Sequence, residues 1–589
     1  MSGPFSIEES FTLPDPLGPD KQTTLADAVR RFVRPGMAIE LAVSLARPNA
    51  WIHELIRAFR GRSPELTLVT LTLSANASLL VHAGVATRAI TTFCGDSYPA
   101  PAPNGVLRRA IRGGRLAVEN WSILTLPLRL EAAAMSVPEL PTHSLLGSTM
   151  AVENAHAFGV RDGVGWVKPL VPDLSFVHAL AADRAGNAIL PAPRGGGIFG
   201  AMAARDGALV SAERIVSTEW IRRHSHLGLL PGQFVRAVVE APLGAHPAPL
   251  WAADCEVEGY ADDYAMLSEL HDATRSDETA ERWLEEWVID TRDHAGYVAK
   301  LGESRVRRLR ARNRHDAWRE EIDDHAALLA SSASPASATA TERQVVDAAR
   351  WIERLALEAR AGSILAGIGN ANLAAWLAQR RLAERGAHVA LMAELGLYGY
   401  EPRPFDPVVF SMRNLATAIW LSDVRTMMSL VLPSQRQPCI GSIGAAEVDR
   451  FGHLNTTRLG DGTPITGSGG GNDIASAAHA VVVCASLAPG RFRERVGYVT
   501  SPGSRVRAVV TERGTFVKEP GASPLRLVSY VPRPELATAE EHVREIRERV
   551  GWNLDVSVDL ERSPEPDPRE LAVVRLFDPH RHYLGDRPA

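Results

Sequence analysis

The chain has 589 residues, of which 45% are apolar and 23% charged, and its formal net charge is −5. This length exceeds what a single hydrophobic core supports, so it predicts at least two domains. The near-balance of 64 basic and 69 acidic residues gives no reason to expect nucleic acid or an anionic membrane as a partner.

Cysteine spacing and the N-terminal sequence indicate the cellular setting. The four cysteines form no CxxC pair, which argues against a disulfide scaffold or a cysteine-rich zinc site. The first twenty residues carry acidic residues and prolines rather than a basic region before an apolar stretch, and no run of eighteen apolar residues occurs. We therefore expect no secretory signal, no membrane span and a cytoplasmic protein.

Apolar runs alternate with amphipathic helical segments in both halves of the chain. In the first half the order is an apolar run at 36–43, a helix at 50–59 and a second run at 66–73. In the second half the same order is found at 362–369, 372–385 and 388–393. This alternation predicts βαβ units and a mainly parallel sheet in each half.

A short turn motif also occurs once in each half. It reads Asp-Arg-Ala-Gly-Asn at 183–187 and Asp-Arg-Phe-Gly-His at 449–453. Two matching patterns in the same order favour a duplicated domain. The fold class that we predict is α/β, with two similar α/β/α domains and a helical appendage to the first.

Composition sets the predicted domain boundaries. Residues 262–330 have apolar residues near helical spacing among Glu and Arg, which predicts the helical appendage. The stretch SSASPASATAT at 331–341 is small, polar and uncharged, which is typical of a linker. The predicted divisions are an N-terminal arm at 1–25, a first domain at 26–330, a linker at 331–344 and a second domain at 345–589.

A glycine turn opens the second half. Gly367 and Gly369 lie in a tight strand-to-helix turn, where backbone amides can approach an anion. The turn invites a dinucleotide-binding interpretation, but Asn372 stands where the third glycine of that motif belongs. An ordinary βα turn explains the same residues.

Glu394 follows directly after an apolar run and precedes two glycines. That position is the carboxyl edge of a predicted parallel sheet, where ligands bind in open α/β folds. A carboxylate there can act as a nucleophile, a general base or a helix cap.

A second glycine-rich loop, Gly467-Ser-Gly-Gly-Gly-Asn472, is followed by an apolar stretch. Four glycines in five residues make a loop rich in amides that can bind an oxyanion or a phosphate, whereas a flexible linker is the alternative. No nucleophile elbow, phosphate-binding P-loop or metal-ligand spacing occurs, so we expect no metal.

Taken in series, these segments resemble family I coenzyme A transferases of the glutaconate CoA-transferase type. The second half resembles the B-type chain of that group, at 389–399, 444–457, 467–475 and 497–503. The first half resembles the A-type chain, at Arg47-Pro48, 120–122, 145–147, 182–187, 244–247, 283–287 and 293–295. The resemblance covers about residues 26–578 and implies that two usually separate subunits are fused here.

The resemblance implies a double-displacement reaction with Glu394 as the nucleophile, which passes through a glutamyl-CoA thioester. Acyl-CoA and a carboxylic acid are then the substrates, with coenzyme A a substrate rather than a tightly bound cofactor, and a homodimer is expected. The residues expected to bind the oxyanion or coenzyme A are Gly367, Gly369, Gly467, Gly469, Gly470, Gly471 and Asn472. Arg47 is expected to hold an acidic group of the substrate, with a structural ion pair as its alternative.

Departures from the family pattern leave the reaction open. Leu395 replaces a small serine after the nucleophile, and Leu41–Ala46 lacks a glycine pair. The alternatives are a CoA-dependent hydrolase that opens a ring-bearing acyl-CoA, a non-catalytic acyl-CoA-binding protein and, last, an NAD oxidoreductase.

Overall fold

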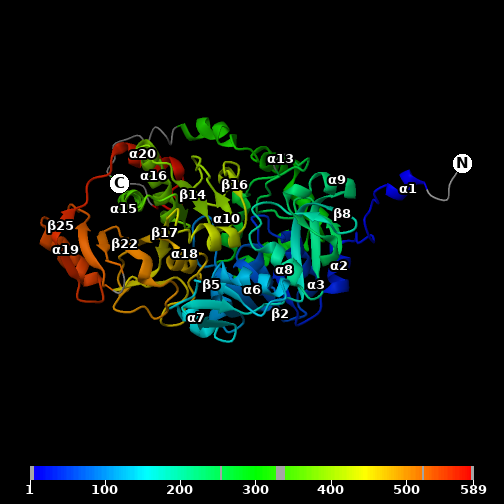
Figure 1. Cartoon of the computed structure of the whole chain (residues 1–589), viewed down its shortest axis with the longest axis horizontal. Helices are drawn as coiled ribbons and strands as arrows, with labels where there is room; N and C mark the ends of the chain where they lie inside the picture. The colour runs from blue at the N-terminus through cyan, green and yellow to red at the C-terminus, as the bar shows by residue number, and fades with distance from the viewer. Residues whose placement is uncertain (1–5, 253–254, 327–337, 521–522, 586–589) are drawn as a thin grey trace.

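The chain folds into two α/β halves that lie side by side (Figure 1). The computed structural model describes residues 6–252, 255–326, 338–520 and 523–585. Each half is built on one large sheet, and two three-stranded sheets lie outside these: β5 (Leu140–Thr142), β6 (Phe158–Arg161) and β7 (Val164–Val167); β18 (Glu447–Asp449), β19 (Leu454–Asn455) and β21 (Phe492–Arg493).

The first sheet has nine strands, and seven of them are joined by parallel pairing. Its main path runs β11-β9-β8-β1-β2-β3-β4, with β10 on β8 and β12 on β10. The strands are β1 (Ala38–Leu41), β2 (Leu66–Leu73), β3 (Ala86–Cys94), β4 (Ala117–Asn120), β8 (Leu174–Asp183), β9 (Ala188–Ile189), β10 (Ala208–Val216), β11 (Leu229–Leu230) and β12 (Val235–Glu240).

The second sheet has ten strands in the order β16-β15-β14-β13-β17-β20-β22-β23-β24-β25. The strands are β13 (Ser363–Ala366), β14 (Ala390–Ala393), β15 (Leu397–Tyr398), β16 (Trp420–Leu421), β17 (Cys439–Ala445), β20 (Ala480–Ala485), β22 (Val506–Val510), β23 (Gly514–Val517), β24 (Arg526–Tyr530) and β25 (Asp555–Arg562).

The two sheets share a five-stranded parallel core, which agrees with the predicted duplication. The order β12-β10-β8-β1-β2 in the first half repeats as β22-β20-β17-β13-β14 in the second, and every neighbouring pair is parallel. The halves differ beyond this core: β3 and β4 extend the first sheet in parallel, whereas β15 and β16 are antiparallel. In this equivalence Glu394, directly after β14, corresponds in position to Ser74, directly after β2.

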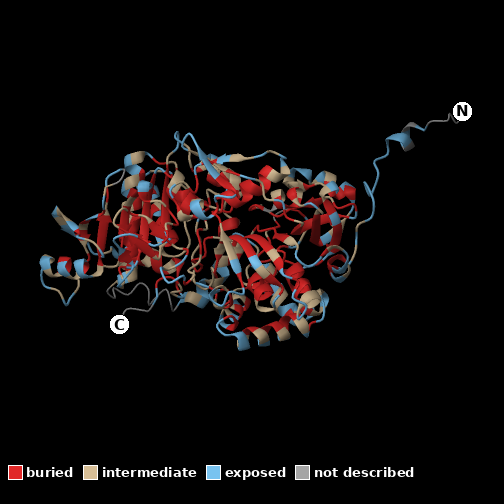
Figure 2. Cartoon of the chain, turned by 90° about the horizontal axis from the view of Figure 1, so that it is seen from below, coloured by how far each residue is buried: buried red, intermediate tan, exposed pale blue. Residues whose placement is uncertain are grey.

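Helices cover the outer faces of both sheets, and a shared hydrophobic cluster fills the space between the halves. One outer cluster packs helices of the first half on its sheet, and another packs α15, α16 and α20 on the second sheet. The cluster between the halves joins residues such as Leu71 and Trp121 to Met392 and Val481. Figure 2 shows buried residues concentrated along both sheets.

The helices of the first half are α2 (Leu25–Phe32), α3 (Asn49–Phe59), α4 (Asn76–His82), α5 (Gly105–Arg112), α6 (Thr125–Ala134), α7 (Thr149–Glu153), α8 (Gly197–Ala203) and α9 (Thr218–Arg223). Those of the second half are α15 (Ala340–Ala359), α16 (Asn370–Glu384), α17 (Met412–Leu415), α18 (Gly471–Ala477), α19 (Ala539–Arg549) and α20 (Pro568–Phe577). The arm before α2 carries one short helix, α1 (Ile7–Phe11), and projects from the body (Figure 1).

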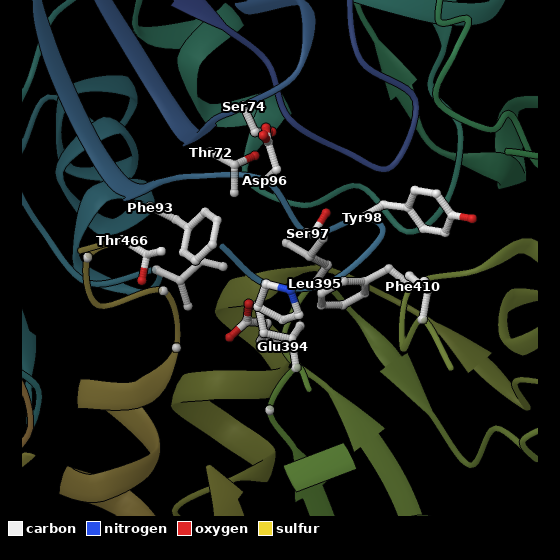
Figure 3. A pocket seen from close by; sticks show the side chains of 18 of the residues that line it. Thr72, Ser74, Phe93, Asp96, Ser97, Tyr98, Glu394, Leu395, Phe410 and Thr466 are labelled. Carbon is white, nitrogen blue, oxygen red and sulfur yellow. The ribbon is translucent and has the colours of Figure 1, made fainter. Parts of the chain in front are cut away.

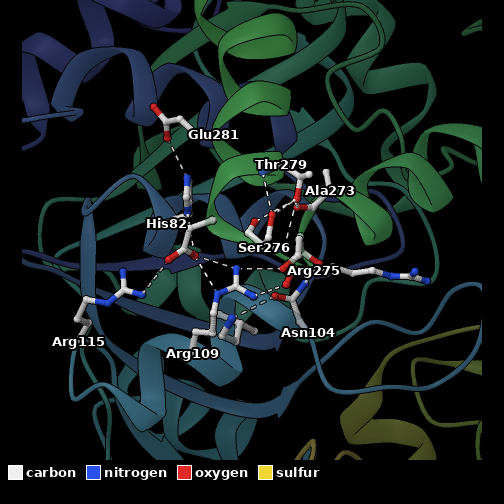
Figure 4. Close-up of polar contacts among 12 residues, drawn as sticks. His82, Asn104, Arg109, Arg115, Ala273, Arg275, Ser276, Thr279 and Glu281 are labelled. Carbon is white, nitrogen blue, oxygen red and sulfur yellow. Dashed lines mark hydrogen bonds and ion pairs between the residues drawn. The ribbon is translucent and has the colours of Figure 1, made fainter.

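The appendage is helical, as the sequence predicts, and polar contacts fix it to the first domain. It contains α10 (Tyr264–Ala273), α11 (Asp277–Leu284), α12 (His294–Leu301) and α13 (Glu303–Ala311). Arg109 on α5 donates to the carboxylate of Asp277 at 2.9 Å and to the carbonyl of Arg275 at 2.7 Å, and His82 lies 2.9 Å from Glu281 (Figure 4). These bonds hold α11 and the turn before it against the edge of the first domain.

The end of the predicted linker needs correction. Thr339 caps α15 with both bonds of a capping box, so residues 340–344 belong to the helix. Glu342 in its first turn is fully buried and pairs with Arg575, which anchors this end of the helix. Residues 327–337, which include the first half of the predicted linker, lie outside the described residues.

The halves are also joined by backbone pairing at the end of β3, where Gly467 bridges to Phe93. Gly467 has φ +113°, and a Cβ there would lie 2.6 Å from the carbonyl oxygen of Thr92. Gly84 also has a positive φ, +69°, but a Cβ there meets nothing within 4 Å. A substitution at either glycine therefore strains the backbone, and only that at Gly467 also collides with the other half.

We predict that Gly467→Ala lowers the thermal midpoint more than Gly84→Ala, because only the first also forces the halves apart. Thermal unfolding followed by circular dichroism measures both. Equal midpoints for the two variants would contradict a tight junction at this position.

Candidate active site

A cavity of about 420 Å³ lies between the two halves at the carboxyl ends of their parallel strands (Figure 3). The first half contributes residues after β1, β2 and β3, and the second half contributes residues after β13, β14 and β17. Much of the lining is apolar, including Phe93, Leu395 and Phe410. This is the edge at which parallel α/β sheets bind ligands.

Glu394 lines this cavity directly after β14, where the sequence predicted it. Burial and, to a lesser extent, the neighbouring Asp473 raise the pKa of its carboxyl to about 7, against a hydrogen bond from the Gly470 backbone that lowers it. No cation among the described residues contributes to this shift. The carboxyl group therefore faces the cavity as an unpaired acid with the pKa of a general base or nucleophile.

Gly470 is the loop residue that approaches the acid most closely. A Cβ at this position would lie 1.9 Å from Oε2 of Glu394, so no other residue type fits without a shift. Gly469 is also near, since its Cβ would lie 4.0 Å from Oε1. The loop composition is thus explained by a close approach of backbone to carboxylate.

Hydrogen bonds join the rest of this loop to the protein. The amide of Gly469 donates to the carbonyl of Thr92 at 2.9 Å, that of Gly467 to Thr456 at 2.9 Å, and that of Gly471 to Ser468 at 2.9 Å. Carbonyl groups of the protein therefore occupy these three of the amides expected to bind an oxyanion, whereas the amide of Gly470 acts on Glu394. The other glycines shape the loop and line the cavity.

The remaining predicted binding residues divide into two groups. Gly367 lines the cavity, whereas Gly369 does not and serves as the N-cap of α16 at φ +87°. Asn472 also lies outside the lining and is fully buried. Its side chain accepts a hydrogen bond from the amide of Leu145 at 2.8 Å and donates one to the carbonyl of Thr500 at 2.8 Å. Because Leu145 belongs to the first half and Thr500 to the second, Asn472 links the two halves.

Arg47 lines the cavity from the turn after β1. Its guanidinium donates to Oγ of Ser74 at 2.7 Å, and its pKa is lowered to about 10 by burial, with Asp96 acting in the opposite direction. It remains a cation at neutral pH. It has no ion pair within 4 Å among the described residues, so the structural ion pair considered from sequence is not formed there.

Asp473, which sequence analysis did not single out, lies next to Glu394 in the first turn of α18 and is fully buried. Ser122 donates to it at 2.6 Å and the amide of Leu124 at 3.3 Å. Burial raises the pKa of Asp473 to about 6 against these bonds. A buried acid thus both links the halves and adds negative potential at Glu394.

The appendage supplies another wall that sequence analysis missed. Asp262, Tyr264 and His271 line the cavity from α10 and the segment before it. Tyr264 stacks on Tyr98 with ring centroids 4.2 Å apart. No pattern local to these residues indicates the contact, because it depends on how α10 docks.

The described residues contain no group of His, Cys, Asp and Glu placed to hold a metal ion. None of their helices is both long enough and apolar enough to cross a bilayer.

Comparison with known proteins agrees with this architecture. The family model described as Coenzyme A transferase matches residues 22–241. The A-type chain of glutaconate CoA-transferase from Acidaminococcus fermentans is 28% identical over 316 residues, covering 49% of this chain and 94% of the relative. The B-type chain of the same enzyme is 31% identical over 168 residues, covering 25% of this chain and 59% of the relative.

Two other relatives extend the comparison. The cholesterol ring-cleaving hydrolase IpdA subunit of Rhodococcus jostii is 31% identical over 245 residues, covering 38% of this chain and 80% of the relative. The crystal structure of an acyl-CoA transferase from Escherichia coli O157:H7, in a thioester complex with CoA, superposes with a TM-score of 0.62 at 15% identity. It covers 96% of this chain and 99% of the other, which establishes the fold of the whole chain.

The fold, the cavity lined by both halves and the matching family model indicate an enzyme that acts on coenzyme A compounds. The chain belongs to the coenzyme A transferase family. It matches both the A-type and the B-type chain of one enzyme, as expected of a polypeptide in which the two parts are fused.

We predict that Asp473→Asn moves the acidic limb of the kcat/KM–pH profile to lower pH, because it removes a negative charge that raises the pKa of Glu394. A shift of roughly one pH unit corresponds to about 1.4 kcal/mol of like-charge repulsion. Initial rates between pH 5 and 9 measure it.

Ser122→Ala is the matched control, since it removes a bond to Asp473 and leaves the charge. Its acidic limb should move much less. An acidic limb for Asp473→Asn that coincides with that of the wild type would exclude an electrostatic effect of Asp473 on Glu394.

Proposed function

We propose that the chain transfers coenzyme A between an acyl-CoA and a free carboxylic acid, with Glu394 as the nucleophile. The observation that carries this proposal is the unpaired carboxyl group of Glu394, held against the Gly470 backbone in a largely apolar cavity between the halves. The family to which the chain belongs supports the reaction class.

The proposed reaction has two exchanges. A carboxylate oxygen of Glu394 attacks the thioester carbonyl, the C–S bond breaks, and CoA leaves as a thiolate. The thiolate then attacks the Glu394 carbonyl of the mixed anhydride, which releases the acyl group as a carboxylate and leaves a glutamyl-CoA thioester. An incoming acid reverses both steps, so atoms and charge balance without water.

The surroundings of Glu394 suit these steps. The apolar lining excludes water that would hydrolyse an anhydride, and it strengthens electrostatic interactions within the cavity. The Gly470 amide offers a hydrogen-bond donor beside the reacting carboxylate, and one such donor contributes roughly 3–4 kcal/mol at an oxyanion. Coenzyme A enters this scheme as a substrate.

The pH dependence follows from the pKa of about 7 at Glu394. Only the deprotonated carboxylate attacks, so kcat/KM should rise about tenfold per pH unit below this value and level off above it. A profile already flat at pH 5.5 would show that Glu394 ionises like an ordinary surface acid.

Glu394→Gln should lower transfer by roughly 10³-fold or more. In the wild type, acyl-CoA without an acceptor acid should leave a CoA adduct on the peptide that contains Glu394, detected by mass spectrometry. Glu401→Gln, an exposed substitution in the same segment, is the control and should keep both activity and adduct. An adduct on another residue would reject the proposed nucleophile.

Glu394→Gln should also raise the thermal midpoint, and more so at pH 8 than at pH 5. The folded-state pKa is raised above the ordinary value of 4.5, so the stabilisation by the neutral acid is lost as pH rises through about 7. Glutamine keeps the neutral form at every pH. A midpoint gain that does not vary with pH would contradict this linkage.

A hydrolase is the second candidate, because a ring-cleaving hydrolase chain is among the relatives. Steady release of free CoA from acyl-CoA without any acceptor acid would favour it, whereas a stalled adduct favours transfer. Binding of acyl-CoA with neither an adduct nor release of CoA would point to a non-catalytic acyl-CoA-binding protein, whereas a Glu394→Ala variant with full activity would exclude Glu394 as the nucleophile. The expected homodimer stays a prediction, measurable by light scattering.

A further inference from the structure

Asp96 and His271 form a hydrogen-bonded pair on the wall of the cavity that faces Glu394. Asp96 follows β3 and His271 lies on α10 of the appendage, and both line the cavity. Nδ1 of His271 lies 2.9 Å from a carboxylate oxygen of Asp96. Figure 3 shows Asp96 across the cavity from Glu394. Neither residue takes part in the proposed transfer of CoA.

Other hydrogen bonds hold Asp96 in place. The side-chain amide of Asn104 lies 3.1 Å from both carboxylate oxygens, and the backbone amide of Ala75 donates to one of them at 3.3 Å. Asp96 is 6% exposed and forms no ion pair with an arginine or lysine within 4 Å among the described residues. The orientation of the carboxylate is therefore fixed, and with it that of the imidazole ring of His271.

The bond to Asp96 determines which ring nitrogen of His271 is basic. A carboxylate accepts hydrogen bonds and donates none, so Nδ1 carries a proton and donates it. In the neutral ring Nε2 then has a free lone pair, and it has no hydrogen-bond partner in the described part of the chain. The bond to Asp96 raises the pKa of His271, with burial acting in the opposite direction. The side chain is 19% exposed, so a proton that it takes up exchanges with solvent.

A cation lies next to this pair. Arg47 also lines the cavity, and the charge of Asp96 acts on it without an ion pair within 4 Å. The guanidinium of Arg47 donates to Oγ of Ser74 at 2.7 Å, and Ser74 precedes Ala75, whose amide is bonded to Asp96. Contacts therefore connect Arg47 to His271 through Ser74 and Asp96, which makes the base and the cation neighbours on one wall.

Removal of a proton next to a carbonyl group requires a base beside a cation. The base takes the proton from Cα, and the electron pair of the C–H bond moves toward the carbonyl oxygen, which becomes an enolate oxygen. A cation at that oxygen stabilises the developing charge, most strongly where water is excluded. An acyl-CoA whose carbonyl oxygen lies at Arg47 has its α-carbon two bonds from that oxygen, on the same wall as Nε2 of His271.

A structural tie between α10 and the first sheet is the alternative role for the pair. It explains the bond at Nδ1 of His271. It does not explain why Nε2 is left without a partner on a cavity wall, or why an arginine without a paired anion lies beside it.

We propose that Asp96 and His271 form a second catalytic unit, which removes and returns the α-proton of a bound acyl-CoA while Arg47 stabilises the enolate oxygen. His271 is the base, Asp96 is a positioning residue for it, and Ser74 orients the guanidinium. The proton moves from Cα to Nε2 and a proton returns to Cα, so no other reactant is consumed. The ligands are acyl-CoA thioesters that carry an α-hydrogen. The proposal rests on the proposed function only in taking an acyl-CoA as the ligand.

Hydrogen–deuterium exchange measures this activity. Butyryl-CoA is incubated in D₂O with the Glu394→Gln protein, in which transfer does not consume the thioester, and its mass and α-hydrogen NMR signals are followed. We expect deuterium to replace both α-hydrogens, because protonated His271 exchanges with solvent before it returns a proton. An added His271→Gln change should slow the exchange by at least about 10²-fold, the scale of general-base catalysis.

Further variants assign the other roles. Arg47→Gln should slow the exchange, whereas His226→Gln, at an exposed histidine, should not. Asp96→Asn should lower the exchange rate at saturating butyryl-CoA with little change in KM, as expected of a residue that acts through His271. Thermal midpoints and calorimetric titration with butyryl-CoA show that each variant is folded and binds the thioester.

Three results would overturn the proposal. The first is exchange no faster than in the absence of protein, and the second is exchange that persists after His271→Gln. The third is exchange that the wild type catalyses and Glu394→Gln abolishes, because Glu394 would then be the base.

This proposal and the proposed function fail in different ways. A protein that exchanges α-hydrogens but never forms a CoA adduct keeps the Asp96–His271 unit and refutes transfer through Glu394. A protein that forms the adduct without exchange keeps the proposed function and refutes the second catalytic unit.

Discussion

The approach of the Gly470 backbone to the carboxyl group of Glu394 is the constraint on which the site depends. A side chain at position 470 would collide with Oε2, so the contact exists only because the loop carries glycine there. The loop reaches this position because its neighbours bond to Thr92 and Thr456, and Ile123 donates to the carbonyl of Gly469 at 3.0 Å. Docking of the two halves and formation of the environment of Glu394 are therefore one structural event.

The two halves contribute side chains of opposite charge to the cavity around this contact. The second half supplies acids, Glu394 and Asp473, whose burial raises their pKa values. The first half supplies the cationic end of the cavity at Arg47. Because β2 is the equivalent of β14, Ser74, which accepts a hydrogen bond from Arg47, corresponds in position to Glu394.

Local patterns in the sequence predicted much of this. Apolar runs and glycine turns located the parallel core, and Glu394 lies at the end of β14 because an acid after a buried strand falls at the carboxyl edge. Gly470, Gly367 and Arg47 also line the cavity. The antiparallel strands β15 and β16 were not predicted, since each has two residues and no detectable period.

What the sequence did not reveal depends on contacts between distant segments. Which loop amides are free is decided by carbonyls such as that of Thr92, hundreds of residues away. Asp473 looks like an ordinary acid in a first helical turn until Ser122 is placed beside it. His271 looks like a residue of a surface helix until α10 docks and brings it to Asp96. Spacing along the chain carries none of this information.

Both walls of the cavity belong to one polypeptide, and this determines how Glu394 becomes enclosed. The enclosure of Glu394 needs residues from both halves. The covalent connection makes their closure independent of protein concentration, so folding of a single chain is sufficient to form the cavity.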